Sequence, residues 1–187
     1  MSFKVVPSRL KGPILIEPSV FPDERGFFTE TFRANDFDEL GVVGPMVQHN
    51  QSRSVRGTVR GMHFHSGPGV SKLVRCARGR IVDVLVDIRP ESATFGEWEA
   101  FDLDDERLRL LYVPVGFGHG FCVLSDIADV VYQQSAYYSS ELESGFSPED
   151  PEVAIEWPVP PGERTISQRD RGAPMLNEIG ELLGGQR

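Results

Sequence analysis

The chain has 187 residues, 40% of them hydrophobic, which is enough for one ordinary domain with a substantial buried core. Its 28 acidic and 19 basic residues give a formal net charge of −9, which argues against a general nucleic-acid binder, because such proteins neutralise phosphates over a broad basic surface. No apolar run approaches the ~20 residues that cross a bilayer and no signal peptide opens the chain, so we expect no membrane segment and a cytoplasmic protein. The two cysteines, Cys76 and Cys122, stand among strand-like residues, a pattern typical of buried thiols in a reducing cytosol.

Short β-strands separated by turns that contain Gly or Pro account for most of the chain. In chain order we expect strands at residues 14–16, 27–32, 47–51, 58–65, 72–77, 80–89, 98–103, 110–113, 121–124 and 129–138. A turn at Gly79 predicts that the strands on either side of it form a hairpin. Helical turns are expected only at 35–40 and 175–183, and a frayed tail at 184–187. This pattern predicts an all-β fold, an antiparallel sandwich or barrel of jelly-roll type, with short peripheral helices in a single domain over residues 1–187.

A basic segment without a single acidic residue runs from Gly41 to Val82 in this otherwise acidic chain. It also contains three of the four histidines, His49, His63 and His65. Such a segment suggests a pocket for an anionic small molecule, and the alternative is a solvated basic face that meets acidic neighbours. Its seven basic residues are Arg53, Arg56, Arg60, Lys72, Arg75, Arg78 and Arg80.

Three histidines are spaced as ligands of a metal enzyme would be. His63 and His65 are two residues apart on an expected strand and therefore point to one face, and His119 follows a tight turn. Three imidazoles can bind zinc or iron with one position left open. A metal-binding cupin also has a Glu a few residues after the His-x-His pair, and Gly69 and Val70 stand there. A metal-dependent cupin enzyme is therefore the alternative interpretation.

A second constellation suits acid–base chemistry. A histidine base, a carboxylate that fixes its tautomer, a lysine near developing oxyanion charge and a tyrosine acid would together remove a proton next to a carbonyl group. His63, Asp170, Lys72 and Tyr132 have the required types, although spacing alone does not bring them together. Each also has a purely structural interpretation, such as a core aromatic for Tyr132 or a solvated charge for Asp170.

Arg60 and His63 have opposite parity on the expected strand, so they can face one cavity only if the strand is interrupted between them. Gly61 lies between them, and an isolated glycine in a strand often marks a β-bulge. We therefore expect a bulge at Gly61.

A series of motifs makes the chain recognisable. They are Arg60-Gly-Met-His-Phe, Lys72-Leu-Val-Arg-Cys-Ala-Arg-Gly, Asp83-Val-Leu-Val-Asp-Ile-Arg, Thr94-Phe-Gly-Glu-Trp, Pro114-Val-Gly-Phe-Gly-His-Gly-Phe, Ile155-Glu-Trp-Pro and Ile166-Ser-Gln-Arg-Asp. In this order, from about residue 12 to 176, they strongly resemble the dTDP-4-dehydrorhamnose 3,5-epimerase family. The resemblance implies a cupin-like jelly roll that works as a homodimer on a dTDP-4-keto-6-deoxyhexose, without a metal or an organic cofactor.

The resemblance also assigns roles to residues. His63 matches the family's catalytic base, Asp170 the carboxylate paired with it, Tyr132 the acid that returns a proton from the opposite face of the sugar, and Lys72 a residue near the enolate oxygen. Part of the nucleotide pocket comes from the partner subunit in this family, and Tyr138 matches the aromatic that stacks on thymine. The positions that match substrate contacts are Arg25, Glu30, Gln48, Asn50, Arg60, His119, Tyr138, Glu143 and Arg169.

The chain departs from the family around the sugar pocket. His65 stands where Gln is common, His49 where Asp is frequent, Gln133 where Lys is common, and Gly69-Val70-Ser71 replaces the usual residues before Lys72. Relatives in antibiotic-sugar pathways invert only C3 or only C5, so inversion at C3, at C5 or at both carbons stays open. A non-catalytic sugar-nucleotide binding module is a third interpretation, against which the set of acid–base residues argues, because binding alone needs no such set.

Overall fold

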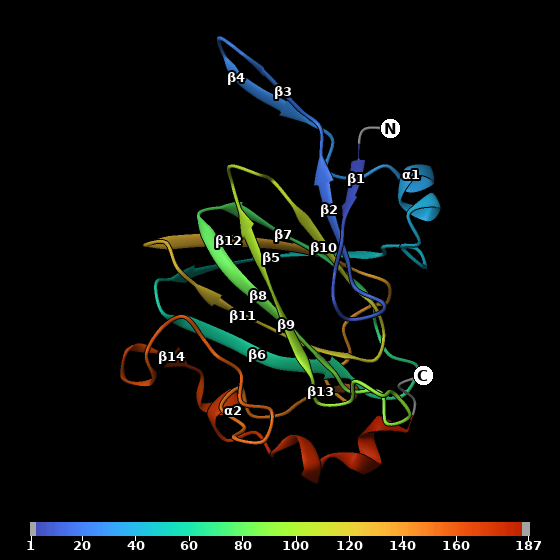
Figure 1. The fold of residues 1–187 in the computed structure, drawn as a ribbon, viewed down its shortest axis with the longest axis vertical. Helices are drawn as coiled ribbons and strands as arrows, with labels where there is room; N and C mark the ends of the chain where they lie inside the picture. Colours follow the sequence, from blue (N-terminus) through green and yellow to red (C-terminus); the bar gives the residue numbers. More distant parts are fainter. Residues whose placement is uncertain (1–2, 185–187) are drawn as a thin grey trace.

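Residues 3–184 are described by the computed structural model, and β-strands are the main regular secondary structure among them (Figure 1). The strands are Phe3–Val6 (β1), Ile14–Pro18 (β2), Val20–Asp23 (β3), Gly26–Thr29 (β4), Gln48–Val55 (β5), Thr58–His65 (β6), Lys72–Arg78 (β7), Arg80–Asp87 (β8), Trp98–Asp104 (β9), Leu110–Val113 (β10), Phe117–Val123 (β11), Ile127–Gln134 (β12), Glu143–Gly145 (β13) and Thr165–Ile166 (β14). The helices and 3₁₀ turns are Ala34–Glu39 (α1), Pro161–Glu163 (η1), Gln168–Arg171 (α2), Leu176–Glu178 (η2) and Gly180–Leu183 (η3).

Two large sheets face each other, and both are built mainly from antiparallel neighbours. The first sheet has the order β1-β2-β10-β7-β12-β5. The second has the order β13-β6-β11-β8-β9, with β14 added parallel to β6. A separate hairpin, β3–β4, projects from the body of the molecule (Figure 1). The prediction of an all-β jelly roll with short peripheral helices is confirmed.

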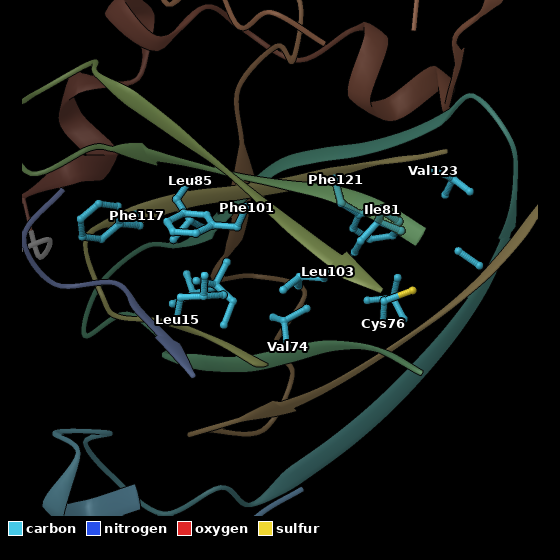
Figure 2. Packing of buried hydrophobic residues seen from close by; sticks show 14 of the residues in the cluster. Leu15, Val74, Cys76, Ile81, Leu85, Phe101, Leu103, Phe117, Phe121 and Val123 are labelled. Atoms are coloured by element: carbon cyan, nitrogen blue, oxygen red, sulfur yellow. The ribbon is translucent and has the colours of Figure 1, made fainter. Parts of the chain in front are cut away.

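The main hydrophobic core lies between the two sheets (Figure 2). Because side chains alternate across a strand, every second residue of β7, β8 and β11 points inward, for example Val74, Ile81 and Phe121. Cys76 belongs to this core and Cys122 to the next one, so both thiols are buried as expected. Burial raises the pKa of the Cys76 thiol to about 12, which keeps it protonated and unreactive.

Two further hydrophobic clusters cover the outer faces of the sheets. The C-terminal segment packs Trp157, Ile166 and Leu176 against the outer side of the second sheet. Helix α1 packs Phe37 against the outer side of the first sheet, where Tyr112 also lies. The first of these clusters places α2 beside β6, which matters for the site below.

The expected hairpin at Gly79 is wrong. β7 pairs with β10 and β12 in the first sheet, whereas β8 pairs with β9 and β11 in the second, so Gly79 is a corner between sheets. Gly79 has φ +80°, and a Cβ there would lie 2.2 Å from the carbonyl oxygen of Ile127. A local turn signal predicts that the chain reverses but does not say which sheet the next strand joins.

The expected helical turns are confirmed at residues 35–40, where α1 begins one residue earlier, with Arg33 as its N-cap. The single helix expected over 175–183 is wrong, because the segment forms two 3₁₀ turns, η2 and η3, that meet at Gly180. A nine-residue helix interrupted by glycine is marginal, and the burial of Leu176, Ile179 and Leu183 decides the conformation instead. Apart from Gly184, the expected frayed tail lies outside the described residues, and no helix within 3–184 is long and apolar enough to cross a membrane.

Candidate active site

A cavity of about 470 Å³ opens between the two sheets. Its walls come from β5, β7 and β12 of the first sheet and from β6, β11 and β13 of the second. Ser52, His65, Phe121, Val130 and Gln134 contribute to the lining. Ten of the predicted site residues also line it, namely Gln48, Asn50, Arg60, His63, Lys72, His119, Tyr132, Tyr138, Glu143 and Arg169.

His63 and Asp170 form a hydrogen-bonded pair, although 107 residues separate them in the chain. Nε2 of His63 donates to Oδ1 of Asp170 over 2.8 Å, which leaves Nδ1 as the ring nitrogen that can accept a proton. Asp170 is buried in α2, and Ser167, the N-cap of that helix, accepts a hydrogen bond from the backbone N–H of Asp170. Burial alone would raise the pKa of the Asp170 carboxyl. The hydrogen bond from His63, the charge of His63 and the hydrogen bond from the Gly61 N–H together outweigh burial, so the pKa of Asp170 is lowered.

The expected bulge at Gly61 is confirmed. Against β11, His63 pairs with His119 and Arg60 pairs with Phe121, so β6 carries one more residue than its partner over this stretch. Gly61 has φ +130°, and a Cβ there would lie 2.6 Å from the Cα of Gly120, so only glycine fits without displacement of the backbone. The bulge allows Arg60 and His63 to face the same cavity.

Tyr132 and Lys72 lie on the sheet opposite His63. They belong to β12 and β7, which are neighbours, whereas His63 belongs to β6 of the other sheet. Burial raises the pKa of the Tyr132 hydroxyl, so it is protonated at neutral pH. Burial lowers the pKa of the Lys72 ammonium, and the charges of Glu143 and Asp83 oppose that shift in part.

Asp83 is a site residue that the sequence analysis missed. Its carboxylate is completely buried, with Oδ2 3.0 Å from Nε2 of His119, and Oδ1 has no hydrogen-bond partner in the described part of the chain. An Asp inside the apolar run Val82-Asp-Val-Leu-Val was the available signal, because a buried charge needs a reason. Gln134 was also missed, and its Oε1 accepts a hydrogen bond from Asn50 over 2.7 Å.

The basic segment contributes less to the cavity than expected. Of its seven cationic residues only Arg60 and Lys72 are among the lining residues, whereas Arg53 pairs with Asp129 on the outer surface. Part of the segment therefore lines the cavity, and part of it lies outside the cavity. Glu143 supplies the one carboxylate among the lining residues of this cavity, and it pairs with Arg169 over 2.9 Å.

Three predicted site residues, Asp170, Arg25 and Glu30, are not among the residues that line this cavity. Asp170 is nevertheless bonded to His63, which does line it, whereas Arg25 and Glu30 lie elsewhere. Arg25 lies at the tip of the β3–β4 hairpin, where it pairs with Asp23 and is 82% exposed. Glu30 follows the hairpin and pairs with Arg33. The fold of one chain therefore does not bring these two residues to His63.

The geometry does not support the metal-enzyme alternative. Nε2 of His63 is bonded to Asp170 and Nε2 of His119 to Asp83. Across residues 3–184, no group of three or more His, Cys, Asp or Glu side chains is arranged to hold a metal ion.

Comparison with known proteins identifies the family of this chain. The sequence model of the dTDP-4-dehydrorhamnose 3,5-epimerase family matches residues 7–178, nearly the whole chain. The chain belongs to this family. The dTDP-4-dehydrorhamnose 3,5-epimerase of Methanothermobacter thermautotrophicus is 44% identical over 177 residues, which is 94% of this chain and 96% of that protein.

Two other members of the epimerase family are informative. The crystal structure of the dTDP-6-deoxy-D-glucose-3,5-epimerase of Legionella pneumophila, in complex with dTDP-4-keto-L-rhamnose, matches with a TM-score of 0.93 and 40% identity, and covers 97% of this chain and 96% of its own. The dTDP-4-dehydrorhamnose 3-epimerase of Streptomyces niveus is 42% identical over 174 residues, which is 92% of this chain and 83% of that protein. Double and single epimerases are therefore both similar to this chain.

Proposed function

We propose that this chain is a cytoplasmic, homodimeric epimerase of one domain that inverts C3 and C5 of a dTDP-4-keto-6-deoxyhexose. The observation that carries the proposal is the placement of a histidine–carboxylate pair and a half-buried tyrosine on opposite walls of one cavity. Inversion needs a base on one face of the carbon and an acid on the other, whereas a binding module needs neither. The names of the relatives support the substrate class, and buried free thiols agree with a reducing compartment.

The proposed reaction begins at a carbon next to the 4-keto group, which acidifies the hydrogens on C3 and C5. Nδ1 of His63 removes one of these protons, while Asp170 holds the ring in the correct tautomer and stabilises the imidazolium that forms. The Lys72 ammonium stabilises negative charge on the enolate oxygen. Tyr132 then donates its hydroxyl proton to the opposite face of the same carbon, which completes the inversion.

The substrate-binding assignments follow the remaining polar groups of the cavity. Arg60 and Arg25 bind the diphosphate, because guanidinium groups bind phosphate oxygens through paired hydrogen bonds. Gln48, Asn50, His119 and Glu143 contact the sugar and nucleoside. Tyr138 is 53% exposed at the cavity and stacks on the thymine ring.

The proposed dimer explains the position of Arg25 and Glu30, because the β3–β4 hairpin of one subunit then reaches the cavity of the other. The hairpin exposes three aromatic side chains, with Phe21 at 55%, Phe27 at 57% and Phe28 at 65%. Such a projecting apolar arm is typical of a segment that is covered in an assembly.

Complementation between two inactive variants tests the proposed exchange of arms. His63→Asn removes the base and Arg25→Ala weakens the arm, so each variant alone has low activity. A mixed dimer contains one site with an intact base and the intact arm of its partner, and mixing should restore activity. If mixing under conditions of subunit exchange restores nothing, the arm does not act across the dimer.

Proton NMR of dTDP-4-keto-6-deoxyglucose with the protein in heavy water tests the activity itself. Deuterium at C3 and C5 of the inverted product is expected, because each returned proton comes from a tyrosine in exchange with solvent. Deuterium at a single carbon would contradict inversion at both centres and indicate a single epimerase. No exchange at either carbon, with the protein folded, would contradict the proposed reaction.

A further inference from the structure

Four polar side chains form a group on one wall of the main cavity. They come from the neighbouring strands β5 and β12, where Asn50 stands directly opposite Tyr132 and Gln48 directly opposite Gln134. Residues two apart on a strand share one face, and all four side chains are among the lining residues of the cavity. Gln134 is 4% exposed, and the proposed reaction gives it no role.

Hydrogen bonds connect the three amides of this group. Nε2 of Gln48 donates to Oδ1 of Asn50 over 3.1 Å, and Nδ2 of Asn50 donates to Oε1 of Gln134 over 2.7 Å. Oε1 of Gln134 also accepts a longer bond from Nε2 of Gln48, at 3.4 Å. The three bonds close a triangle, so the orientation of each amide depends on the other two.

The backbone N–H of Tyr138 fixes these orientations. It donates to Oε1 of Gln48 over 2.8 Å, and because a backbone N–H can only donate, the amide oxygen of Gln48 must face Tyr138. The NH₂ group of Gln48 therefore faces Asn50, which must present its oxygen there. Rotation of the Asn50 amide by half a turn would set two donors against each other at Gln48 and two acceptors against each other at Gln134.

The fixed Asn50 amide has a consequence for the proposed acid. One hydrogen of its NH₂ group is bonded to Gln134, and the other can serve Tyr132, which lies directly across the strand pair. Burial raises the pKa of the Tyr132 hydroxyl, and a hydrogen bond from Asn50 opposes this rise, as a donor that stabilises a phenolate does. Because the tyrosine oxygen accepts the bond from Asn50, the hydroxyl proton stays available for a substrate.

We propose that Gln134 is a positioning residue for the acid, which holds the NH₂ group of Asn50 on the Tyr132 oxygen and so directs the hydroxyl proton to the substrate. When this proton moves to the enolate carbon, the electron pair of the O–H bond stays on the phenolate oxygen, where the N–H of Asn50 stabilises it. A reversed Asn50 amide would instead accept the hydroxyl proton in a hydrogen bond and hold it away from the sugar. This inference rests on the proposed function and adds a second role to the substrate contact assigned to Asn50.

Gln134→Met tests this role, because methionine keeps the length of the side chain but offers Asn50 only a weak acceptor. Deuterium uptake from heavy water into the recovered substrate should be nearly unchanged, because His63 and Asp170 are intact. Inversion at saturating substrate should fall by about 10–10²-fold, the usual effect of one hydrogen bond to a charged oxygen. Gln133→Met is the matched control and should leave both rates unchanged, because Gln133 precedes Gln134 on β12 and is not among the lining residues of the cavity.

A double-mutant cycle with Tyr132→Phe separates this role from general damage to the site. If Gln134 acts through the Tyr132 hydroxyl, Gln134→Met should cause no further loss of inversion in a protein that lacks the hydroxyl. Asn50→Asp gives an independent test, because its carboxylate still accepts from Gln48 but has no hydrogen to donate to Tyr132. The ratio of inversion to deuterium uptake should therefore fall in Asn50→Asp as well.

Three results would overturn the proposal. They are unchanged inversion in Gln134→Met, a parallel loss of uptake and inversion in that variant, and a full additional loss of inversion when Gln134→Met is combined with Tyr132→Phe. Absence of both uptake and inversion in the unmodified protein is a different result, which would overturn the proposed function and this inference with it.

Discussion

The replacement of Tyr132 by Phe is the most direct perturbation of the proposed mechanism. The Tyr132 ring packs against the main core, and Phe keeps that packing. The hydroxyl has one side-chain hydrogen bond, with Asn50, and loss of a bond of this kind costs about 0.5–1.5 kcal/mol of stability. The variant should therefore fold, so a loss of activity would report on chemistry.

The expected loss in inversion rate is ~10²–10⁴-fold, the usual contribution of a positioned acid, which corresponds to about 2.7–5.4 kcal/mol of transition-state stabilisation. Proton abstraction on the opposite wall needs no tyrosine, so deuterium should still enter the recovered substrate at the carbon that faces His63. Proton NMR in heavy water measures both quantities in one sample. Inversion within about threefold of the unmodified protein would refute the assignment of the acid.

Three other variants test separate parts of the site. Asp170→Asn should lower kcat by about 10³–10⁴-fold with little change in KM, because the imidazole loses its tautomer control, and steady-state kinetics would show otherwise if Asp170 only binds substrate. The pKa of Asp170 in the folded protein lies below its usual 3.8, so the carboxylate stabilises the fold above about pH 4. This stabilisation is lost as the pH falls through the folded-state pKa. The urea midpoints of the parent protein and of Asp170→Asn should therefore converge in acid. Because the pKa of Lys72 is lowered, activity should be lost as the pH rises, at a pH below the usual 10.5 of a lysine. Lys72→Arg should move this alkaline limb of the kcat/KM profile to higher pH. A limb that does not move would belong to another group. Gly61→Ala should destabilise the fold by about 1–3 kcal/mol in chemical denaturation, whereas Gly162→Ala, where a methyl group meets open space, should change it by less than about 0.5 kcal/mol, and equal effects would contradict the proposed steric constraint at the bulge.

Local sequence patterns predicted ten of the fourteen described strands, because alternation of apolar residues and turn signals are properties of neighbouring residues; the short strands β1, β3, β13 and β14 were missed. Thr58–His65 forms as expected, and the bulge at Gly61 was expected from the opposite parity of Arg60 and His63 and the glycine between them. Sequence patterns failed where contacts between residues far apart in the sequence decided the structure. The chain turns at Gly79, but the expected hairpin does not form, because the two strands enter different sheets and bury their inner faces between them.

The sequence by itself determined an all-β fold, a cavity with cationic and histidine side chains, and the residue types for acid–base chemistry. Only the tertiary structure decided which of these residues meet. It brings Asp170 to His63 by packing the C-terminal segment on the outer side of the second sheet, and it sets Tyr132 on the facing sheet. It also leaves Arg25 outside the cavity of its own chain. Distances between residues far apart in sequence depend on how sheets pack, and no local pattern contains that information.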